Sequence, residues 1–318
     1  MEVRKVNGFF IIFVIGYIGL SVVCASIMAY AQNSGIAVPD WIQYVMSEGI
    51  MLLIAIIYMI VQKIDPIREI SYKRIGIVDV ILSLVAGYCL IPAVLLISNL
   101  SMLFSTNYLE EGTTTLLTYP FAMQVILLAV IPPLVEELIF RGIFFGSYRK
   151  AGMTGAALMS GLLFGCFHLN INQALYAFVM GIVFAYMVEA TGSLWSSVIA
   201  HFAVNTYSIG IVQILKMAGI YAQDGSVSET FENAESVAGQ STAVMVVQIA
   251  MIAVIAAVFM MLAVLCIRTM AKRHGNLEKM KIQKVKLSHI KNYFTAPVIV
   301  GIVVCVMYMI MLEFSGTL

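Results

Sequence analysis

The sequence predicts an all-α protein: a polytopic bundle of about eight or nine transmembrane helices around an intramembrane cavity. Three observations lead to this fold class. The 318-residue chain is 61% hydrophobic and only 11% charged, whereas a soluble domain carries about 25% charged residues. Several uncharged stretches reach the roughly 20 residues that span a bilayer core. The sequence shows no repeat of fixed period, so we expect a single membrane domain, residues 1–318.

The hydropathy pattern predicts nine helices. The first is too long for the h-region of a signal peptide, so we expect it to remain as a span. The fifth and sixth are the shortest, and only the segment LNIN separates them. The five cysteines lie within apolar runs without paired spacing, which predicts buried thiols rather than disulfides or metal ligands. In order, the helices are expected at about 8–31, 41–62, 77–104, 119–147, 153–168, 173–189, 193–216, 241–268 and 293–314.

The distribution of charge predicts the orientation in the membrane. If the N-terminus is cytoplasmic, all Lys and Arg residues except Arg141 and Lys216 lie on the cytoplasmic side, as the positive-inside rule requires. The opposite side carries the acidic segment 217–240. The basic segment 268–291 serves as a positive-inside anchor or lies on the anionic inner leaflet. We therefore predict a multi-pass protein of the cell membrane with a cytoplasmic N-terminus, in contact with membrane lipid and not with nucleic acid.

The fourth helix contains the segment PPLVEELIFRG, where three charged residues lie among apolar ones. Ionisable residues within spans are costly and usually mark a functional site. Pro132 and Pro133 remove the backbone donors that would bond the carbonyls of Leu128 and Ala129. We expect a kink or an unwound turn at this point, where it would line a cavity.

Helical spacing separates the two carboxylates of this segment. Glu137 and Arg141 are four residues apart and share a helix face, which predicts a structural ion pair. Glu136 lies about 100° around the helix and has no partner on its own helix. Its partner is therefore expected on another helix, and His168 and His201 are the only histidines within the predicted spans.

Glu136, His168 and His201 are predicted to lie at different depths in the membrane. Counting about 1.5 Å per residue from the predicted cytoplasmic ends places His201 about 12 Å deep, Glu136 about 16 Å and His168 about 22 Å. The three can meet if the fifth helix is tilted or starts later, or if the segment HLNIN folds back into the bundle. Asn205 lies four residues after His201, on the same helix face.

Other polar and small residues within or near the spans have plainer expected roles. Asp79 and Glu189 are close enough to helix ends to reach the membrane interface. Glu48 is well inside the second helix and has no evident partner. Gly161 and Gly165 predict that the fifth helix approaches a neighbour closely.

Three short motifs occur in order on the fourth, fifth and seventh helices. EELIFR fits EExxxR, FGCFH fits FxxxH and HFAVN fits HxxxN. With these motifs, residues 119–210 resemble the family of CAAX-prenyl endopeptidases and bacteriocin-processing enzymes, which are intramembrane proteases. The resemblance covers about a third of the chain and marks 119–210 as its catalytic core. It implies a substrate that is a peptide or a lipidated protein: a prenylated CAAX-like C-terminus, a leader, or a pheromone or bacteriocin peptide.

The resemblance also implies roles for the motif residues. Glu136 is the catalytic glutamate, His168, His201 and Asn205 complete the site, and Glu137 and Arg141 support it. A carboxylate in an apolar cavity can act as a general base near neutral pH. We expect Glu136 to activate water, His168 to hold that water or relay its proton, and His201 with Asn205 to stabilise the oxyanion.

A metal site and two non-proteolytic functions are the alternatives. Glu136, His168 and His201 offer the ligand set of a hydrolytic zinc site. A metal-free mechanism is favoured, because Asn205 suits an oxyanion donor better than a zinc ligand. A proton-coupled transporter is disfavoured because the sequence shows no paired repeats with broken helices. A catalytically silent membrane scaffold or regulator is the other alternative, while HExxH and GxSxG, the signatures of other proteases, do not occur.

Overall fold

The described part of the chain, in a computed structural model, comprises residues 3–65, 70–106, 118–219, 242–282 and 287–315. All regular structure within these ranges is helical, which confirms the predicted helical bundle. Most of the acidic segment 217–240 lies outside them. The long helices are α1 (Val3–Asn33), α2 (Trp41–Val61), α4 (Ile77–Ser101), the span Phe121–Ala151, α10 (Ile171–Thr191), α11 (Trp195–Met217), α13 (Thr242–Arg273) and α15 (Ala296–Ser315).

Eight helices among the described residues are long and apolar enough to cross a membrane. The ninth apolar helix, α9 (Met153–Phe167), has 15 residues. Its length is about 22 Å, less than the roughly 30 Å of a bilayer core. The predicted sixth helix is longer than expected, since α10 has 21 residues. All five cysteines are free thiols.

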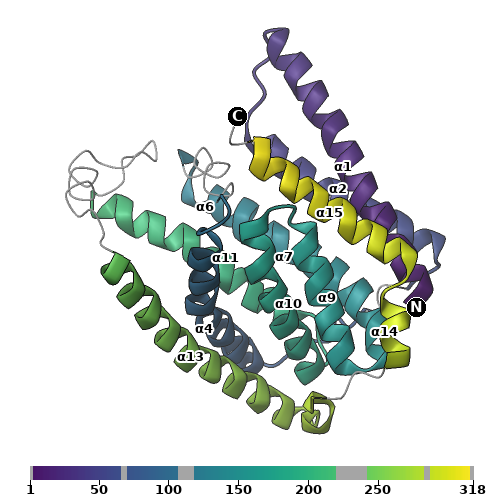
Figure 1. The fold of residues 1–318 in the computed structure, drawn as a ribbon, viewed down its shortest axis with the longest axis vertical. Helices are drawn as coiled ribbons and strands as arrows, with labels where there is room; N and C mark the ends of the chain where they lie inside the picture. Colours follow the sequence, from purple (N-terminus) through teal and green to yellow (C-terminus); the bar gives the residue numbers. More distant parts are fainter. Residues whose placement is uncertain (1–2, 66–69, 107–117, 220–241, 283–286, 316–318) are drawn as a thin grey trace.

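The helices form three groups that lie side by side (Figure 1). Helices α1, α2 and α15 pack together at one edge, and α4 packs along α13 at the opposite edge. Between them lie α9, α10, α11 and α7 (Ile131–Glu137). Ring contacts attach α1 to the centre, with 5.4 Å between the centroids of Phe9 and Phe144. The helices that carry the three motifs are therefore in the interior of the protein.

The span Phe121–Ala151 changes helix type along its length instead of unwinding at the prolines. A π-helical segment ends at Val130, directly before α7, and a second begins at Leu138. The expectation of an unwound turn is therefore wrong, because the chain stays helical through Pro132 and Pro133. The alternative expectation of a kink stays a prediction. π-Helical turns are rare and are frequent at functional sites. In order, the segments are α6 (Phe121–Gln124), η2 (Val125–Val130), α7, η3 (Leu138–Phe145), α8 (Gly146–Tyr148) and η4 (Arg149–Ala151).

Helix α9 is enclosed by protein, with 12 of its 15 residues buried. Two glycines bring it against α10. A Cβ atom added at Gly161 would lie 2.8 Å from the carbonyl oxygen of Phe178, and one added at Gly165 would lie 2.5 Å from that of Ala174. The predicted close approach of this helix to a neighbour is therefore confirmed.

The C-terminal part of the chain covers another side of α9. Tyr293, at the end of α14 (Leu287–Tyr293), lies so close that a Cβ atom added at Gly155 would come within 2.7 Å of its ring. The buried amide of Asn7 donates to the carbonyl of Asn292 at 2.9 Å. The hydroxyl of Tyr148 donates to Asn7 Oδ1 at 2.7 Å. These contacts join α1, the fourth span, α9 and α14.

The connection between α9 and α10 lies inside the bundle. Leu169 and Asn170 are only 8% and 6% exposed. Leu169 has a φ of 54°, in the left-handed region that a leucine rarely adopts, and reverses the chain sharply. The side chain of Asn170 accepts a hydrogen bond from the backbone N–H of Gln173, and Asn172 Nδ2 donates to Ser101 Oγ at 2.8 Å. The segment HLNIN therefore folds back into the bundle. This is one of the ways in which His168 could reach the same depth in the membrane as Glu136 and His201.

Segments predicted to be cytoplasmic meet at one end of the bundle. Asp79, in the first turn of α4, accepts from Arg273 Nε at 3.2 Å and from His274 Nε2 at 3.0 Å. Glu189, near the end of α10, pairs with Arg149 Nη2 at 3.0 Å. Asp79 and Glu189 thus lie near helix ends, where each meets a basic partner that the sequence had not indicated; their position at the membrane interface stays a prediction. The side of the membrane on which this end lies stays a prediction of the positive-inside rule.

Candidate active site

Glu137 and Arg141 form a fully buried ion pair. Arg141 Nη1 lies 3.0 Å from Glu137 Oε1, and neither side chain is exposed. The two groups are not aligned for a hydrogen bond, since the guanidinium nitrogens and Glu137 Oε2 have no hydrogen-bond partner among the described residues. The predicted structural pair is therefore present. It is held by charge attraction, which is strong where water is excluded.

Aromatic rings enclose the guanidinium of Arg141. Its central carbon lies 4.2 Å from the ring centroid of Phe164 and 5.3 Å from that of Phe184. A cation over an aromatic face is attracted by the ring, more so when desolvated. Gly181 leaves room for this group, because an added Cβ atom there would lie 3.1 Å from Arg141 Nη2. The phenylalanine of FxxxH thus packs on the arginine of EExxxR, a contact that joins two motifs.

His201 lies between the two glutamates. Its Nδ1 is 3.1 Å from Glu137 Oε1, and its Nε2 is 3.7 Å from Glu136 Oε2. Glu136 therefore meets a partner on another helix, as its position predicts. The contact between Glu137 and His201 was not predicted, because spacing alone directs the two carboxylates to different neighbours. One imidazole can face both, since its two nitrogens lie on different edges of the ring.

Glu136 combines burial with an unfilled hydrogen-bonding capacity. Its side chain is 14% exposed, yet its Oε2 is buried without a hydrogen-bond partner among the described residues. Glu48 of α2 also has a buried Oε2 without such a partner, and its charge acts on Glu136. Buried polar atoms without partners are rare in folded proteins and call for a specific explanation. Glu48 therefore places a second carboxyl group near Glu136 and gains no partner for its own Oε2 within the described residues.

His168 lies beside this group without touching Glu136 directly. Its Nδ1 is 2.8 Å from the carbonyl oxygen of Phe164. A carbonyl oxygen only accepts, so in a neutral ring Nδ1 carries the hydrogen and Nε2 is an acceptor. The ring of Phe164 contacts both imidazoles, with centroids 4.6 Å from His168 and 5.9 Å from His201. The structure thus places His201 Nε2 3.7 Å from Glu136 Oε2, and the ring of Phe164 lies against both imidazoles.

Asn205 has a backbone partner. Its Nδ2 donates to the carbonyl oxygen of Leu128 at 3.0 Å. This carbonyl is one of the two whose α-helical donors the prolines remove, since the N–H that would bond it belongs to position 132. Asn205 therefore satisfies an acceptor that Pro132 leaves free and joins α11 to the π-helical segment. The second N–H of the amide is available to another acceptor.

Across the described ranges, no group of three or more His, Cys, Asp or Glu side chains is placed to hold a metal ion. His201 Nδ1 faces Glu137 and His168 Nδ1 faces a carbonyl, so Nε2 is the nitrogen that each ring would offer to a metal. The chemistry considered below assigns no step to a metal.

Comparisons with known proteins match the central part of the chain. A family model for "Type II CAAX prenyl endopeptidase Rce1-like" proteins matches residues 118–207. A Bacillus subtilis (strain 168) protein named "Putative membrane peptidase YdiL" is 33% identical over 88 residues, which are 27% of this chain and 36% of that protein. The aligned region thus spans only about a third of the relative's length. No solved structure matches.

The matched region contains all three motifs and every residue of the candidate site except Glu48. The EExxxR, FxxxH and HxxxN segments lie within it, on helices that meet in the interior. The resemblance noted from the motifs is therefore confirmed. The chain is a polytopic membrane protein whose residues 118–207 match the model of the Rce1-like type II CAAX prenyl endopeptidases.

Proposed function

We propose that this protein is an intramembrane endopeptidase that hydrolyses a peptide bond in a membrane-associated peptide or protein, with Glu136 as the general base. The observation that carries the proposal is the environment of the Glu136 carboxylate. Its Oε2 is buried, makes no hydrogen bond within the described part of the chain, and lies 3.7 Å from His201 Nε2. The family of the matched segment supports the same activity.

The separation of Glu136 and His201 suits a bridging water. A polar contact longer than about 3.5 Å commonly holds a water between its groups. In the proposed reaction the oxygen of this water attacks the scissile carbonyl carbon, and its proton passes to Glu136. The protonated Glu136 then gives that proton to the leaving amine as the carbon–nitrogen bond breaks. His168 Nε2, left as an acceptor by the bond at Nδ1, helps to orient the water.

His201 and Asn205 are assigned to the developing oxyanion. His201 Nδ1 faces a carboxylate oxygen, which only accepts, so Nδ1 is the donor in that contact. The proposed role of Nε2 as a second donor requires the imidazolium form, in which both nitrogens carry a hydrogen. Glu136 and Glu137 stand on either side of that ring and stabilise its charge. Asn205 keeps one N–H beyond its bond to Leu128. Donors fixed before the reaction stabilise an oxyanion without reorganising.

Glu137 and Arg141 hold this arrangement and do not react. Arg141 fixes Glu137 at 3.0 Å, and Glu137 fixes the imidazole of His201 at 3.1 Å. The rings of Phe164 and Phe184 hold Arg141 in turn. A prenylated CAAX-like C-terminus, a leader peptide, and a pheromone or bacteriocin peptide are the substrate classes proposed.

The proposed activity can be tested by mapping new peptide termini. Wild-type protein and the Glu136→Gln variant are placed separately in liposomes with a membrane-peptide fraction and with synthetic prenylated CAAX peptides. Mass spectrometry then compares the termini produced. We expect new internal cleavages with the wild type alone. A transporter or a silent scaffold would give identical termini for both proteins, and that result would refute the proposal.

Asn205→Ala is expected to lower kcat by about 10²–10³-fold, the usual loss for one oxyanion donor. It also removes the partner of the Leu128 carbonyl, so a moderate loss of stability of about 1–3 kcal/mol is expected as well. The measurement is kcat in liposomes together with the thermal unfolding midpoint. Asn205→Gln keeps an amide donor and is the matched control. Full activity of Asn205→Ala would remove this residue from the oxyanion site.

A further inference from the structure

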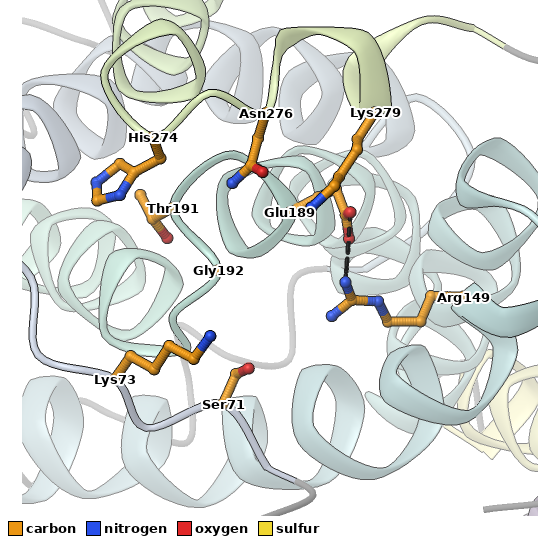
Figure 2. A pocket seen from close by; sticks show the side chains of 9 residues that line it. All are labelled: Ser71, Lys73, Arg149, Glu189, Thr191, Gly192, His274, Asn276 and Lys279. Carbon is orange, nitrogen blue, oxygen red and sulfur yellow. Dashed lines mark hydrogen bonds and ion pairs between the residues drawn. The ribbon is translucent and has the colours of Figure 1, made fainter.

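A cavity lies at the end of the bundle where the charged segments meet. Its volume is about 310 Å³, and none of the proposed catalytic residues lines it. Figure 2 shows that its side chains come from four parts of the chain: the segment before α4, the end of the fourth span, the α10–α11 connection and the segment after α13. The lining residues are Ser71, Lys73, Arg149, Glu189, Thr191, Gly192, His274, Asn276 and Lys279.

The cavity has an excess of positive charge. Arg149 pairs with the one carboxylate of the lining, Glu189, at 3.0 Å, and His274 is engaged with Asp79 outside the cavity at 3.0 Å. Lys73 and Lys279 have no acidic partner in the part of the chain that the structure describes. Lys73 and Arg149 extend toward the same open space in Figure 2. Within the described residues, the ammonium groups of Lys73 and Lys279 are therefore available to bind an anion.

Backbone and side-chain bonds hold the walls of the cavity in place. The N–H of Leu194 donates to the carbonyl of Ser71 at 2.7 Å. The hydroxyl of Ser193 donates to the carbonyl of Lys73. Asn276 Nδ2 donates to a carbonyl at the end of α10 at 3.0 Å. These bonds hold together segments that are far apart in the sequence. Because the walls of the cavity are already fixed, binding of a ligand would cost little conformational entropy.

Two aromatic residues next to the lining indicate the depth of this end in the membrane. The ring centroids of Tyr72 and Trp195 lie 5.8 Å apart, with 62° between the ring planes. Both side chains are partly exposed, at 37% and 36%. Tyr and Trp are enriched where the hydrocarbon core meets the headgroups. The cavity therefore lies at headgroup level, on the side that the positive-inside rule assigns to the cytoplasm.

We propose that this cavity binds a phosphoryl anion, supplied either by the headgroup of an anionic lipid or by free phosphate. The ammonium groups of Lys73 and Lys279 attract phosphate oxygens as point charges, and the free edge of Arg149 adds fixed donors. The hydroxyl of Ser71 is a further donor at the wall. A volume of about 310 Å³ is at the lower end of small-molecule sites. Basic pockets between membrane helices are suited to anionic headgroups.

The test measures binding of two defined probes to the full-length protein. Native mass spectrometry follows retention of phosphatidylglycerol against phosphatidylcholine in nanodiscs, and a thermal-shift titration in detergent follows inorganic phosphate. The double variant Lys73→Gln/Lys279→Gln removes both unpaired charges. The control Arg74→Gln/Lys272→Gln removes two exposed charges near the same end but outside the lining. A third variant, Lys73→Arg/Lys279→Arg, keeps the charge.

We expect the first variant to bind about 30-fold more weakly, from the contribution of two lysines near a headgroup. The control pair and the arginine variant should stay close to wild type. Dependence on Lys73 and Lys279 in the lipid arm alone identifies a headgroup, and dependence in both arms identifies the phosphate itself. Equal losses in the first variant and the control would show diffuse surface attraction and overturn the proposal. So would a wild-type protein that binds neither probe.

Discussion

Replacing Glu136 by glutamine is expected to lower kcat for peptide hydrolysis by about 10²–10⁴-fold, the usual contribution of a general base. Glutamine has nearly the same shape as glutamate but cannot accept the proton of the attacking water. The fold is expected to remain intact, because the buried Oε2 makes no hydrogen bond that the change would break within the described residues. The measurements are kcat in liposomes and the thermal unfolding midpoint of the same preparation.

Two neighbouring carboxylates provide controls for this result. Glu137→Gln should lower stability, because Glu137 contacts both Arg141 and His201. Glu48→Gln should keep the fold and lower kcat less than Glu136→Gln does, since Glu48 acts on Glu136 only through its charge. If Glu136→Gln unfolded the protein while Glu137→Gln changed neither activity nor stability, the roles assigned to the two would be reversed.

Arg141→Ala is expected to lower the free energy of unfolding by about 3–5 kcal/mol, the range found when one partner of a buried pair is removed. The change leaves Glu137 charged and fully buried, and it empties the space between Phe164 and Phe184. Because Glu137 positions His201, activity should fall in the protein that remains folded. The measurement is unfolding in mixed micelles of detergent and denaturing surfactant, together with the yield of monodisperse protein.

Arg149→Ala is the matched control for Arg141→Ala. Arg149 also pairs with a glutamate at 3.0 Å, but its side chain is 36% exposed. Ion pairs that water reaches contribute only about 0–1 kcal/mol. A similar loss for both variants would mean that burial does not set the strength of these pairs, which would contradict the explanation given for Arg141.

Much of the fold and part of the site follow from local sequence patterns. Long apolar runs predict helices because each must satisfy its own backbone in lipid. The pair Glu137–Arg141 follows from a spacing of four residues, and the close packing of α9 follows from Gly161 and Gly165. These features depend on neighbours in the sequence, so periodicity is enough to find them.

The remaining features depend on residues that meet only in the folded chain. Nothing local indicates that Asn205 bonds the Leu128 carbonyl, 77 positions away, although Pro132 does show that this carbonyl lacks a donor. The ring of Phe184 on Arg141 and the approach of Glu48 to Glu136 also come from helix packing. The prolines were expected to unwind the chain, and the sequence carried no sign that π-helical turns would accommodate them.

The enclosure of α9 has a consequence for the order of assembly during synthesis. A 15-residue helix is too short to rest stably across a bilayer alone, and its polar turn must be shielded by other helices. Part of that shield is Tyr293, which lies against Gly155. The ribosome makes this residue more than a hundred positions after α9. The helix that precedes His168 therefore reaches its final environment only when the C-terminal segment docks, so we expect the proposed site to be completed only after the last helices are made.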